Sequence, residues 1–360
     1  MLALDRYLFK TLSSSLLFSV GLFLCLDVLF AIIAELNDIR GAYTIGDVFY
    51  FITLTIPGRI YELFPLTAVV AVVISLGTLA SGSELVVMLA SGFGKMRIAS
   101  SVLIAVGFWL IWVVVIGEFV SPAGEKMANT FRAQEISDGQ GIATESSVWI
   151  RDGTTIFNAR RLIKGQAATE YVLEGVTVFE FKDNKAEKIS RASTAFFNNG
   201  QWLLKDLEVS IFDEGGVKVD RFKEQQWQSR IEPEILNISL IRPKYLSLRD
   251  INKLQQFAGK DEQLLSAYQV AWWSKWFFPV FVLVIALCGV PFVFGQLRSG
   301  GFGQRLVIGA MLGVVMYLMN KTLLNVGEVY HVHPSLVVVL PSVLIATVAI
   351  WSLRRTGHMR

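Results

Sequence analysis

Cysteine, histidine and charge are all scarce in this sequence. Two cysteines and three histidines occur in 360 residues, and 18% of residues are charged. An average soluble domain has about 25% charged residues. Cys25 and Cys288 both lie in long apolar stretches, so we expect no disulfide framework. His331 and His333 have no carboxylate or cysteine set beside them, and we expect no metal site.

The sequence also lacks a motif for chemistry of its own. A phosphate-binding loop has the pattern Gly-x-x-x-x-Gly-Lys-Ser/Thr. Around Gly94 and Lys95, Leu89 replaces the first glycine and Met96 replaces the hydroxyl residue. No Ser/His/Asp arrangement and no acid/base cluster stands out. We therefore expect no enzyme activity and no cofactor, and a net charge of +3 is too small to indicate nucleic acid binding.

Long apolar stretches are abundant instead. Hydrophobic residues make up 53% of the chain, and a membrane-spanning helix needs about 20 of them in a row. Six such segments run approximately over residues 9–34, 49–79, 98–120, 272–294, 306–326 and 336–353. We predict three transmembrane helices within 1–121, an inserted domain over 122–268, and three more helices within 269–360. The insert, roughly 150 residues long, exceeds an ordinary loop.

Basic residues alternate between the two sides of these segments. They occur at both ends of the chain, between segments two and three, and between segments four and five: Arg6, Lys10, Lys95, Arg97, Arg298, Arg305, Arg354, Arg355 and Arg360. Cytoplasmic loops carry an excess of lysine and arginine. We therefore expect both termini to be cytoplasmic and the insert to be periplasmic in a bacterium.

The insert has the pattern of an all-β domain. Apolar residues alternate with polar ones in short runs, and turn signals separate these runs at 152–153, 183–184, 198–200 and 214–216. Short strands at this spacing indicate an antiparallel sandwich or roll, with helices expected over 122–136 and 246–268. The candidate interior residues are Phe179, Phe181, Phe196, Phe197, Leu207, Val209 and Ile211. Phe196 and Phe197 are adjacent, so only one of them can face inward on a regular strand.

Residues 83–92 predict a short helix on the cytoplasmic side. Ser83 is suited to cap its start, Gly92 is suited to end it, and Glu84 falls in the first turn, where the helix dipole favours an acid. Such a helix touches lipid alone or docks a cytoplasmic partner. Glu84 favours docking, because an acid is unfavourable beside anionic head groups. The candidate coupling residues are Glu84, Leu85, Val86, Met88, Ser91 and Gly92.

A specific resemblance follows from several runs. Residues 83–93 (SELVVMLASGF), 117–125 (GEFVSPAGE) and 132–134 (RAQ) resemble the LptF/LptG permeases of lipopolysaccharide export. Residues 61–66, 273–275 and 340–342 are also similar to that family. The resemblance spans nearly the whole chain, and the LptG branch fits better than the LptF branch.

The resemblance implies a subunit of an ABC transporter in the inner membrane of a Gram-negative bacterium. Its partners would be an LptF permease, an LptB ATPase homodimer, and LptC, through which LptA is reached. Lipopolysaccharide would be extracted from the outer leaflet and passed to a bridge of periplasmic β-jellyrolls. The insert would then be jellyroll-like and offer an open edge to another roll. Its interior residues would form a path for acyl chains, unless they form a closed, packed core.

The resemblance also suggests a role for charges inside the predicted helices. Lys321 and Asp27 lie roughly 8–10 Å below the outer ends of segments five and one, at about 1.5 Å per residue. Lys321, with Arg40 in the outer loop, would hold lipid phosphates, and Asp27 would pair with Lys321 in the empty state. The alternative is that Lys321 reaches water along its own stem. Gly309 and Gly313 permit close helix approach, either within the chain or to another subunit.

Two other functional classes fit the same layout. A membrane scaffold would hold a periplasmic adaptor without moving lipid, and an integral-membrane enzyme would act on lipids. The enzyme is disfavoured by the missing acid/base or metal set. Copurification of an ATPase distinguishes the transporter from the scaffold.

Overall fold

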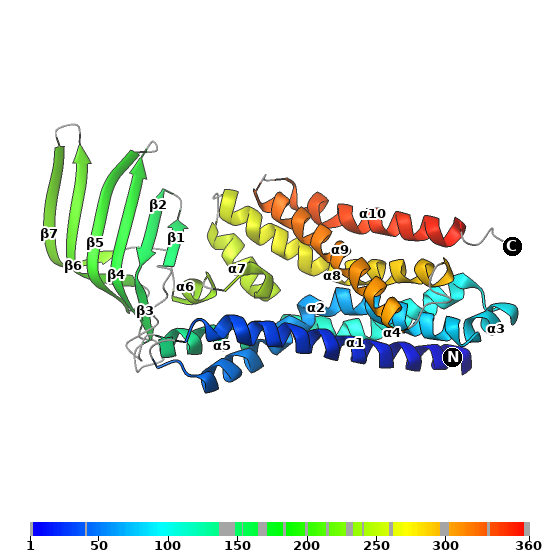
Figure 1. Cartoon of the computed structure of the whole chain (residues 1–360). Coiled ribbons are helices and arrows are strands. Elements are labelled where there is room, and N and C mark those ends of the chain that lie inside the picture. Colours follow the sequence, from blue (N-terminus) through cyan, green and yellow to red (C-terminus); the bar gives the residue numbers. More distant parts are fainter. Residues whose placement is uncertain are drawn as a thin grey trace. The chain divides into compact units, whose positions relative to one another are not determined.

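A computed structural model describes most of the chain. The described residues are 3–39, 42–136, 148–152, 154–164, 171–182, 185–198, 201–213, 216–227, 233–239, 241–258, 262–295, 302–329 and 332–355. The chain divides into two compact units. The first contains residues 1–31, 56–121 and 269–360, and the second contains residues 32–55 and 122–268. The order of elements can be followed in Figure 1.

Within these described ranges, six helices are long and apolar enough to cross a membrane, as the sequence predicted. Their elements are α1 (Ala3–Leu36), α2 (Ile45–Ser81), α4 (Lys95–Val115) with η1 (Ile116–Val120) and α5 (Ser121–Ile136), α8 (Glu262–Gly295), α9 (Phe302–Val329) and α10 (Pro334–Arg355). A seven-residue helix, α3 (Glu84–Ala90), follows α2. These segments are helical because long apolar runs in a bilayer must satisfy every backbone polar group internally.

The central helix of the first unit is α2. In its apolar window 89% of residues are buried, against 11% in α1 and in α9. Glycines on α9 let that helix approach closely, because a Cβ at Gly313 would lie 2.4 Å from Leu66 Cδ1 and one at Gly309 would lie 3.3 Å from Val70 Cα. Gly309 and Gly313 therefore pack within the chain, which resolves the alternative that the sequence left open.

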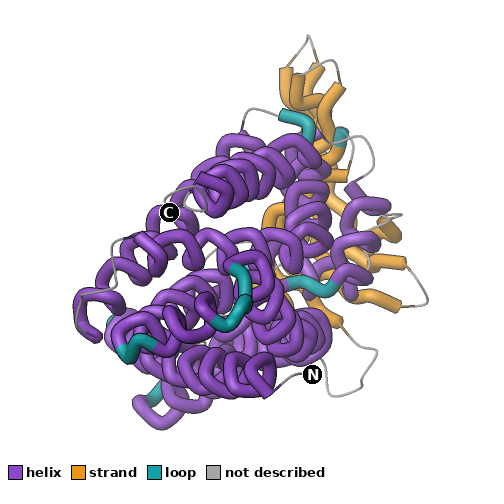
Figure 2. Tube along the Cα trace, turned by 90° about the vertical axis from the view of Figure 1, so that its right-hand side faces the viewer, coloured by secondary structure: helices purple, strands orange, loops and turns teal. Residues whose placement is uncertain are grey.

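The insert forms one antiparallel sheet, drawn in orange in Figure 2. Its strands are β1 (Val148–Asp152), β2 (Thr155–Ala159), β3 (Arg161–Lys164), β4 (Tyr171–Lys182), β5 (Lys185–Asn198), β6 (Gln201–Asp213) and β7 (Gly216–Trp227). Neighbouring strands follow the order β1-β2-β4-β5-β6-β7, and β3 also pairs with β4. All four predicted turn positions fall at breaks between consecutive strands, and most of the turn residues themselves lie outside the described ranges. The all-β insert is thus confirmed, and the sheet is open.

One face of the sheet carries the core of the second unit. The buried residues of this core are Phe157, Ala159, Leu173, Val176, Val178, Ala192, Ala195, Trp202, Leu204, Leu207, Val209 and Leu236. Leu236 comes from α6 (Pro233–Ser239), and Phe257 of α7 (Leu248–Ala258) packs against the same cluster. A short 3-10 helix, η2 (Pro243–Tyr245), lies between these two helices in the chain. The sheet thus buries one face under helices from its own unit.

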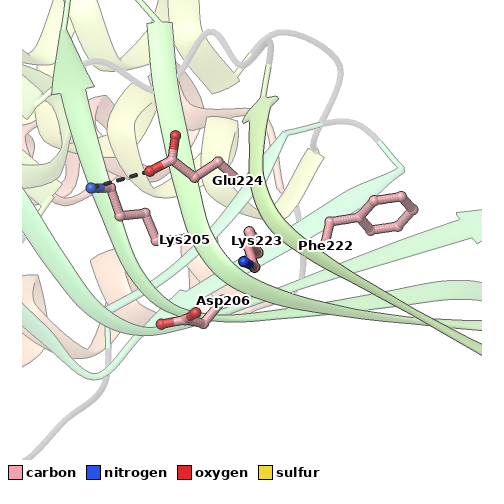
Figure 3. A pocket seen from close by; sticks show the side chains of 5 residues that line it. All are labelled: Lys205, Asp206, Phe222, Lys223 and Glu224. Atoms are coloured by element: carbon pink, nitrogen blue, oxygen red, sulfur yellow. Dashed lines mark ion pairs between the residues drawn. The ribbon is translucent and has the colours of Figure 1, made fainter.

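A row of four residues interrupts the pairing across β4 to β7. Gly175, Ser193, Asp206 and Lys223 lie between paired positions on each of these strands. Gly175 and Asp206 both have positive φ, at 63° and 49°, a conformation that bends an extended strand. We call this row the crease. The strands curve along their length in Figure 1 and are strongly bent near Asp206 in Figure 3.

Candidate functional site

The short helix α3 is flanked by two residues with positive φ, Ser83 before it and Gly92 after its C-cap. Ser83 occupies the N-cap position, as predicted, but it has φ 61° and its hydroxyl makes no capping hydrogen bond. Its backbone carbonyl instead accepts hydrogen bonds from the amides of Val86 and Val87, both at 3.1 Å. At the other end, Gly92 has φ 88°, and the Phe93 amide donates to the Met88 carbonyl at 2.9 Å. This glycine-terminated end is the one that the sequence predicted.

The two faces of α3 have different surroundings. Leu85 and Met88 are only 3% and 5% exposed and pack in the chain's own core. They stabilise the helix from within, so they are not available to a partner while the helix is packed. The outer residues are exposed, and we call them the docking face: Glu84, Val86, Val87, Ala90 and Ser91. Val87 is the most prominent apolar member, with 67% of its surface exposed.

The charges inside the membrane helices are paired differently from our prediction. Asp27 on α1 forms an ion pair with Arg59 on α2, with 2.6 Å between Oδ2 and Nη1. The expected pairing of Asp27 with Lys321 is therefore wrong. The sequence carried a signal for Arg59, because it is a basic residue inside a predicted membrane segment and such a group needs a partner.

Lys321 lies on the exposed side of α9. Its ammonium is 5.8 Å from the centre of the Tyr317 ring, and the Tyr317 hydroxyl donates to Glu62 on α2 at 2.9 Å. At an exposed site a cation is only weakly attracted to an aromatic ring. The contact with the Tyr317 ring therefore leaves the Lys321 ammonium accessible. Arg40, the other predicted phosphate contact, lies outside the described residues.

A third polar contact joins η1 to α8. The Lys275 ammonium lies 2.9 Å from Glu118 Oε2, and the Lys275 side chain is only 8% exposed. The neighbouring Gly117 leaves room for Tyr61, since a Cβ there would lie 2.2 Å from the Tyr61 ring. Tyr61 in turn stacks on Phe278, with ring centres 4.0 Å apart. The π-helical turn η1 therefore fits around a partly buried aromatic pair.

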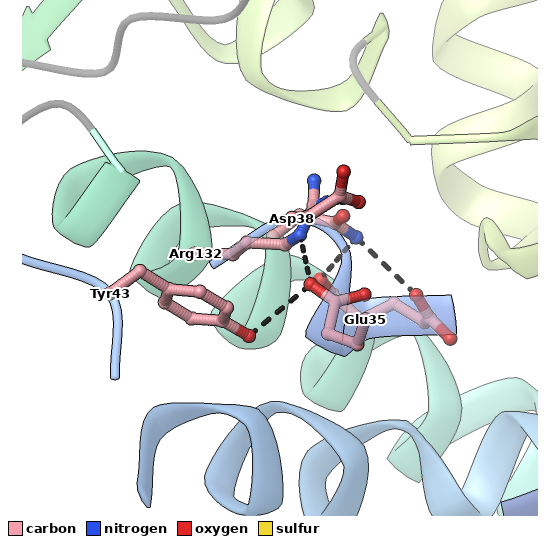
Figure 4. A network of polar contacts seen from close by, with 6 residues as sticks. Glu35, Asp38, Tyr43 and Arg132 are labelled. Atoms are coloured by element: carbon pink, nitrogen blue, oxygen red, sulfur yellow. Dashed lines mark hydrogen bonds and ion pairs between the residues drawn. The ribbon is translucent and has the colours of Figure 1, made fainter. Parts of the chain in front are cut away.

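In the second unit, one guanidinium joins two carboxylates (Figure 4). Arg132 pairs with Glu35 and with Asp38, the latter at 2.5 Å, and lies 5.7 Å from the Phe51 ring centre. Tyr43 donates to Glu35 at 3.3 Å. Burial raises the pKa of Tyr43, and the negative charge of Glu35 raises it further, so the phenol stays protonated. This network ties α1 and α5 to the segment between α1 and α2.

The predicted interior residues of the sheet divide between its two faces. Leu207 and Val209 are buried in the core, and Phe197 and Ile211 pack against it. Phe179 follows the buried Val178 and therefore lies on the opposite face. Phe196 also lies there, with the Lys205 ammonium 5.0 Å from its ring centre. Phe181 follows a register shift at Glu180 and is half-buried.

Two hollows lie on the surfaces of the two units. The first, about 640 Å³, lies at the crease and is lined by Lys205, Asp206, Phe222, Lys223 and Glu224 (Figure 3). Its charges are mixed, and Lys205 pairs with Glu224 at 3.3 Å. The second, about 380 Å³, is apolar and is lined by Trp272, Trp273, Trp276, Phe277 and Val280 on α8. Tryptophans gather at the interface of a membrane with water, which fits this part of α8.

Comparison with known proteins identifies the family to which this chain belongs. Residues 6–355 match the lipopolysaccharide export system permease family LptF/LptG. The chain belongs to this family. It is 29% identical over 357 residues to the lipopolysaccharide export system permease protein LptG of Escherichia coli K12, covering 98% of each chain. It is 27% identical over 356 residues, again 98% of each chain, to LptG of Haemophilus influenzae.

The runs that carried the family resemblance occupy structurally distinct places. Residues 83–93 form α3 with its two ends, and residues 117–125 contain the π-helical turn and the start of α5. Residues 273–275 bring Lys275 to Glu118. In this LptF/LptG family chain, these runs therefore form a helix end, a close helix contact and a partly buried ion pair.

Proposed function

We propose that this chain is the LptG-type permease subunit of an ABC transporter for lipopolysaccharide. In this role it pairs with an LptF permease and two copies of the LptB ATPase. It extracts lipopolysaccharide from the outer leaflet of the inner membrane and passes it through LptC towards LptA. The family match over nearly the whole chain supports this role. The distribution of basic residues supports cytoplasmic termini and a periplasmic sheet.

The docking face of α3 is the observation that carries the proposal. It presents Val86 and Val87 beside one carboxylate, Glu84, in a chain whose sequence lacks a nucleotide-binding motif. An apolar face with one acid fits a groove that contains an arginine, because a buried carboxylate needs a charged or hydrogen-bonding partner. ATP hydrolysis in a separate subunit would then move the membrane helices through α3.

The lipid contacts that we propose differ between the two units. In the first unit, Lys321 contacts the phosphates of the lipid, while Asp27 is already neutralised by Arg59. In the sheet, the apolar face with Phe197, Leu207, Val209 and Ile211 guides acyl chains when the unit opens. Among the described strands, β7 lies at an edge of the sheet, and its outer backbone groups would pair with a strand of another periplasmic roll. The apolar side chains of Val217 and Val219 on β7 are exposed and favour such an addition.

Charge reversal at Glu84 tests the proposal. The chain is purified with its LptF and LptB partners in nanodiscs, and ATPase copurification and lipopolysaccharide-stimulated hydrolysis are measured. Glu84→Lys is expected to abolish both, because it places a cation against the arginine of the partner groove. Glu208→Lys, which reverses an exposed glutamate on β6, serves as the control and is expected to leave both intact. Normal copurification and normal hydrolysis with Glu84→Lys would overturn the assignment of α3.

A further inference from the structure

The cytoplasmic end of α1 contacts the glutamate of the docking face. The hydroxyl of Tyr7 donates a hydrogen bond of 2.7 Å to Glu84 Oε2. The two residues are 77 positions apart in the sequence, and Tyr7 keeps 44% of its surface exposed. The contact therefore lies at the molecular surface, beside the helix to which we assign ATPase docking.

A shared core holds both partners of this hydrogen bond in place. Leu8, the next residue after Tyr7, is fully buried in the cluster that also contains Leu85 and Met88 of α3. Asp5 fixes the same end of α1 to α4, because its carboxylate accepts a hydrogen bond from Ser101 at 3.0 Å and pairs with Arg97 at 3.4 Å. The distance between Tyr7 and Glu84 is thus set by packed helices.

The Tyr7 phenol occupies only one of the hydrogen-bond acceptor sites of the Glu84 carboxylate. Tyr7 bonds to Oε2, and a carboxylate has two oxygens that together accept about four hydrogen bonds. Within the described part of the chain, the structure gives Glu84 no second side-chain hydrogen bond. The remaining acceptor sites are therefore available to an arginine of a docking protein, while the phenol restricts the rotamers of the glutamate. Fixing a side chain before binding lowers the entropy lost on binding.

We propose that Tyr7 is a positioning residue for Glu84, and that the start of α1 belongs to the ATPase-docking surface. The inference rests on the proposed function of α3. The Tyr7 phenol orients the Glu84 carboxylate toward the cation of the partner. Because α1 packs against α3, α1 moves with α3 when the ATPase moves.

The test removes one oxygen atom. Tyr7→Phe keeps the ring and deletes the hydroxyl, and the affinity of purified LptB for the permease pair in nanodiscs is measured by titration. Loss of one hydrogen bond to a charged, exposed group is expected to weaken docking about threefold to tenfold. Tyr43→Phe, which deletes another tyrosine–glutamate hydrogen bond far from α3 in the sequence, is the matched control and leaves the affinity unchanged. Unchanged or tighter docking by Tyr7→Phe would overturn the proposal.

A double-mutant cycle separates positioning from a structural role. If Tyr7 acts through Glu84, Tyr7→Phe has no further effect in a Glu84→Gln background. The same loss in both backgrounds would mean that Tyr7 contacts the partner itself or maintains the fold, and would refute positioning. Failure of the proposed function has a different signature, because Glu84→Gln alone would then leave docking at the wild-type level.

Discussion

Val87 provides the most direct test of which side of α3 binds the ATPase. Val87→Ala removes two methyl carbons, each contributing about 0.8 kcal/mol when fully buried. In the isolated chain 67% of Val87 is exposed, so docking can bury about two-thirds of the side chain. The two lost methyl groups therefore reduce the binding free energy by roughly 1 kcal/mol. Docking should therefore weaken about fivefold. The assay is the titration of LptB against the permease pair in nanodiscs.

Two further variants make the test decisive. Val217→Ala makes the same substitution at a valine that is 58% exposed on β7, and it should leave docking unchanged. Leu85→Ala acts on the buried face of α3 and should cost about 2–5 kcal/mol of stability, seen as a lower thermal unfolding midpoint. Wild-type docking by Val87→Ala, together with lost docking by a stably folded Leu85→Ala, would show that the opposite face binds and would refute the reasoning.

Three other variants test the charged groups and the backbone. Lys321→Gln should weaken lipopolysaccharide binding, and weaken it less for lipid without phosphates; equal losses would exclude phosphate contact. Gly117→Ala should lower stability by about 1–3 kcal/mol because the new Cβ clashes with Tyr61, whereas Gly107→Ala in α4 meets its nearest neighbour at 3.9 Å and should be tolerated. Asp206→Gly should stabilise the second unit by about 0.5–1 kcal/mol by relieving a positive φ, measured by thermal unfolding; a lower midpoint would argue against strain at the crease.

Local physics made much of the fold predictable. Six spans followed from the length of the apolar runs, since a bilayer fixes the number of residues that a helix needs. The four breaks between strands followed from clusters of Gly, Asn and Asp, which favour turn conformations. The end of α3 followed from Gly92, because its positive φ suits glycine. Each of these features depends on a few consecutive residues, so the sequence by itself determined them.

Contacts between distant segments decided the rest. Apolar residues occur on both sides of β4, and only the packing of Phe157 on β2 beside Val178 selected the inner face, which leaves Phe179 on the other. The same holds for α3, where burial of Leu85 in the core left Val87 outside. Asp27 had two candidate cations, and the approach of α1 to α2 gave it Arg59. Periodicity defines the faces of an element, but the neighbour that covers one of them depends on how the whole chain packs.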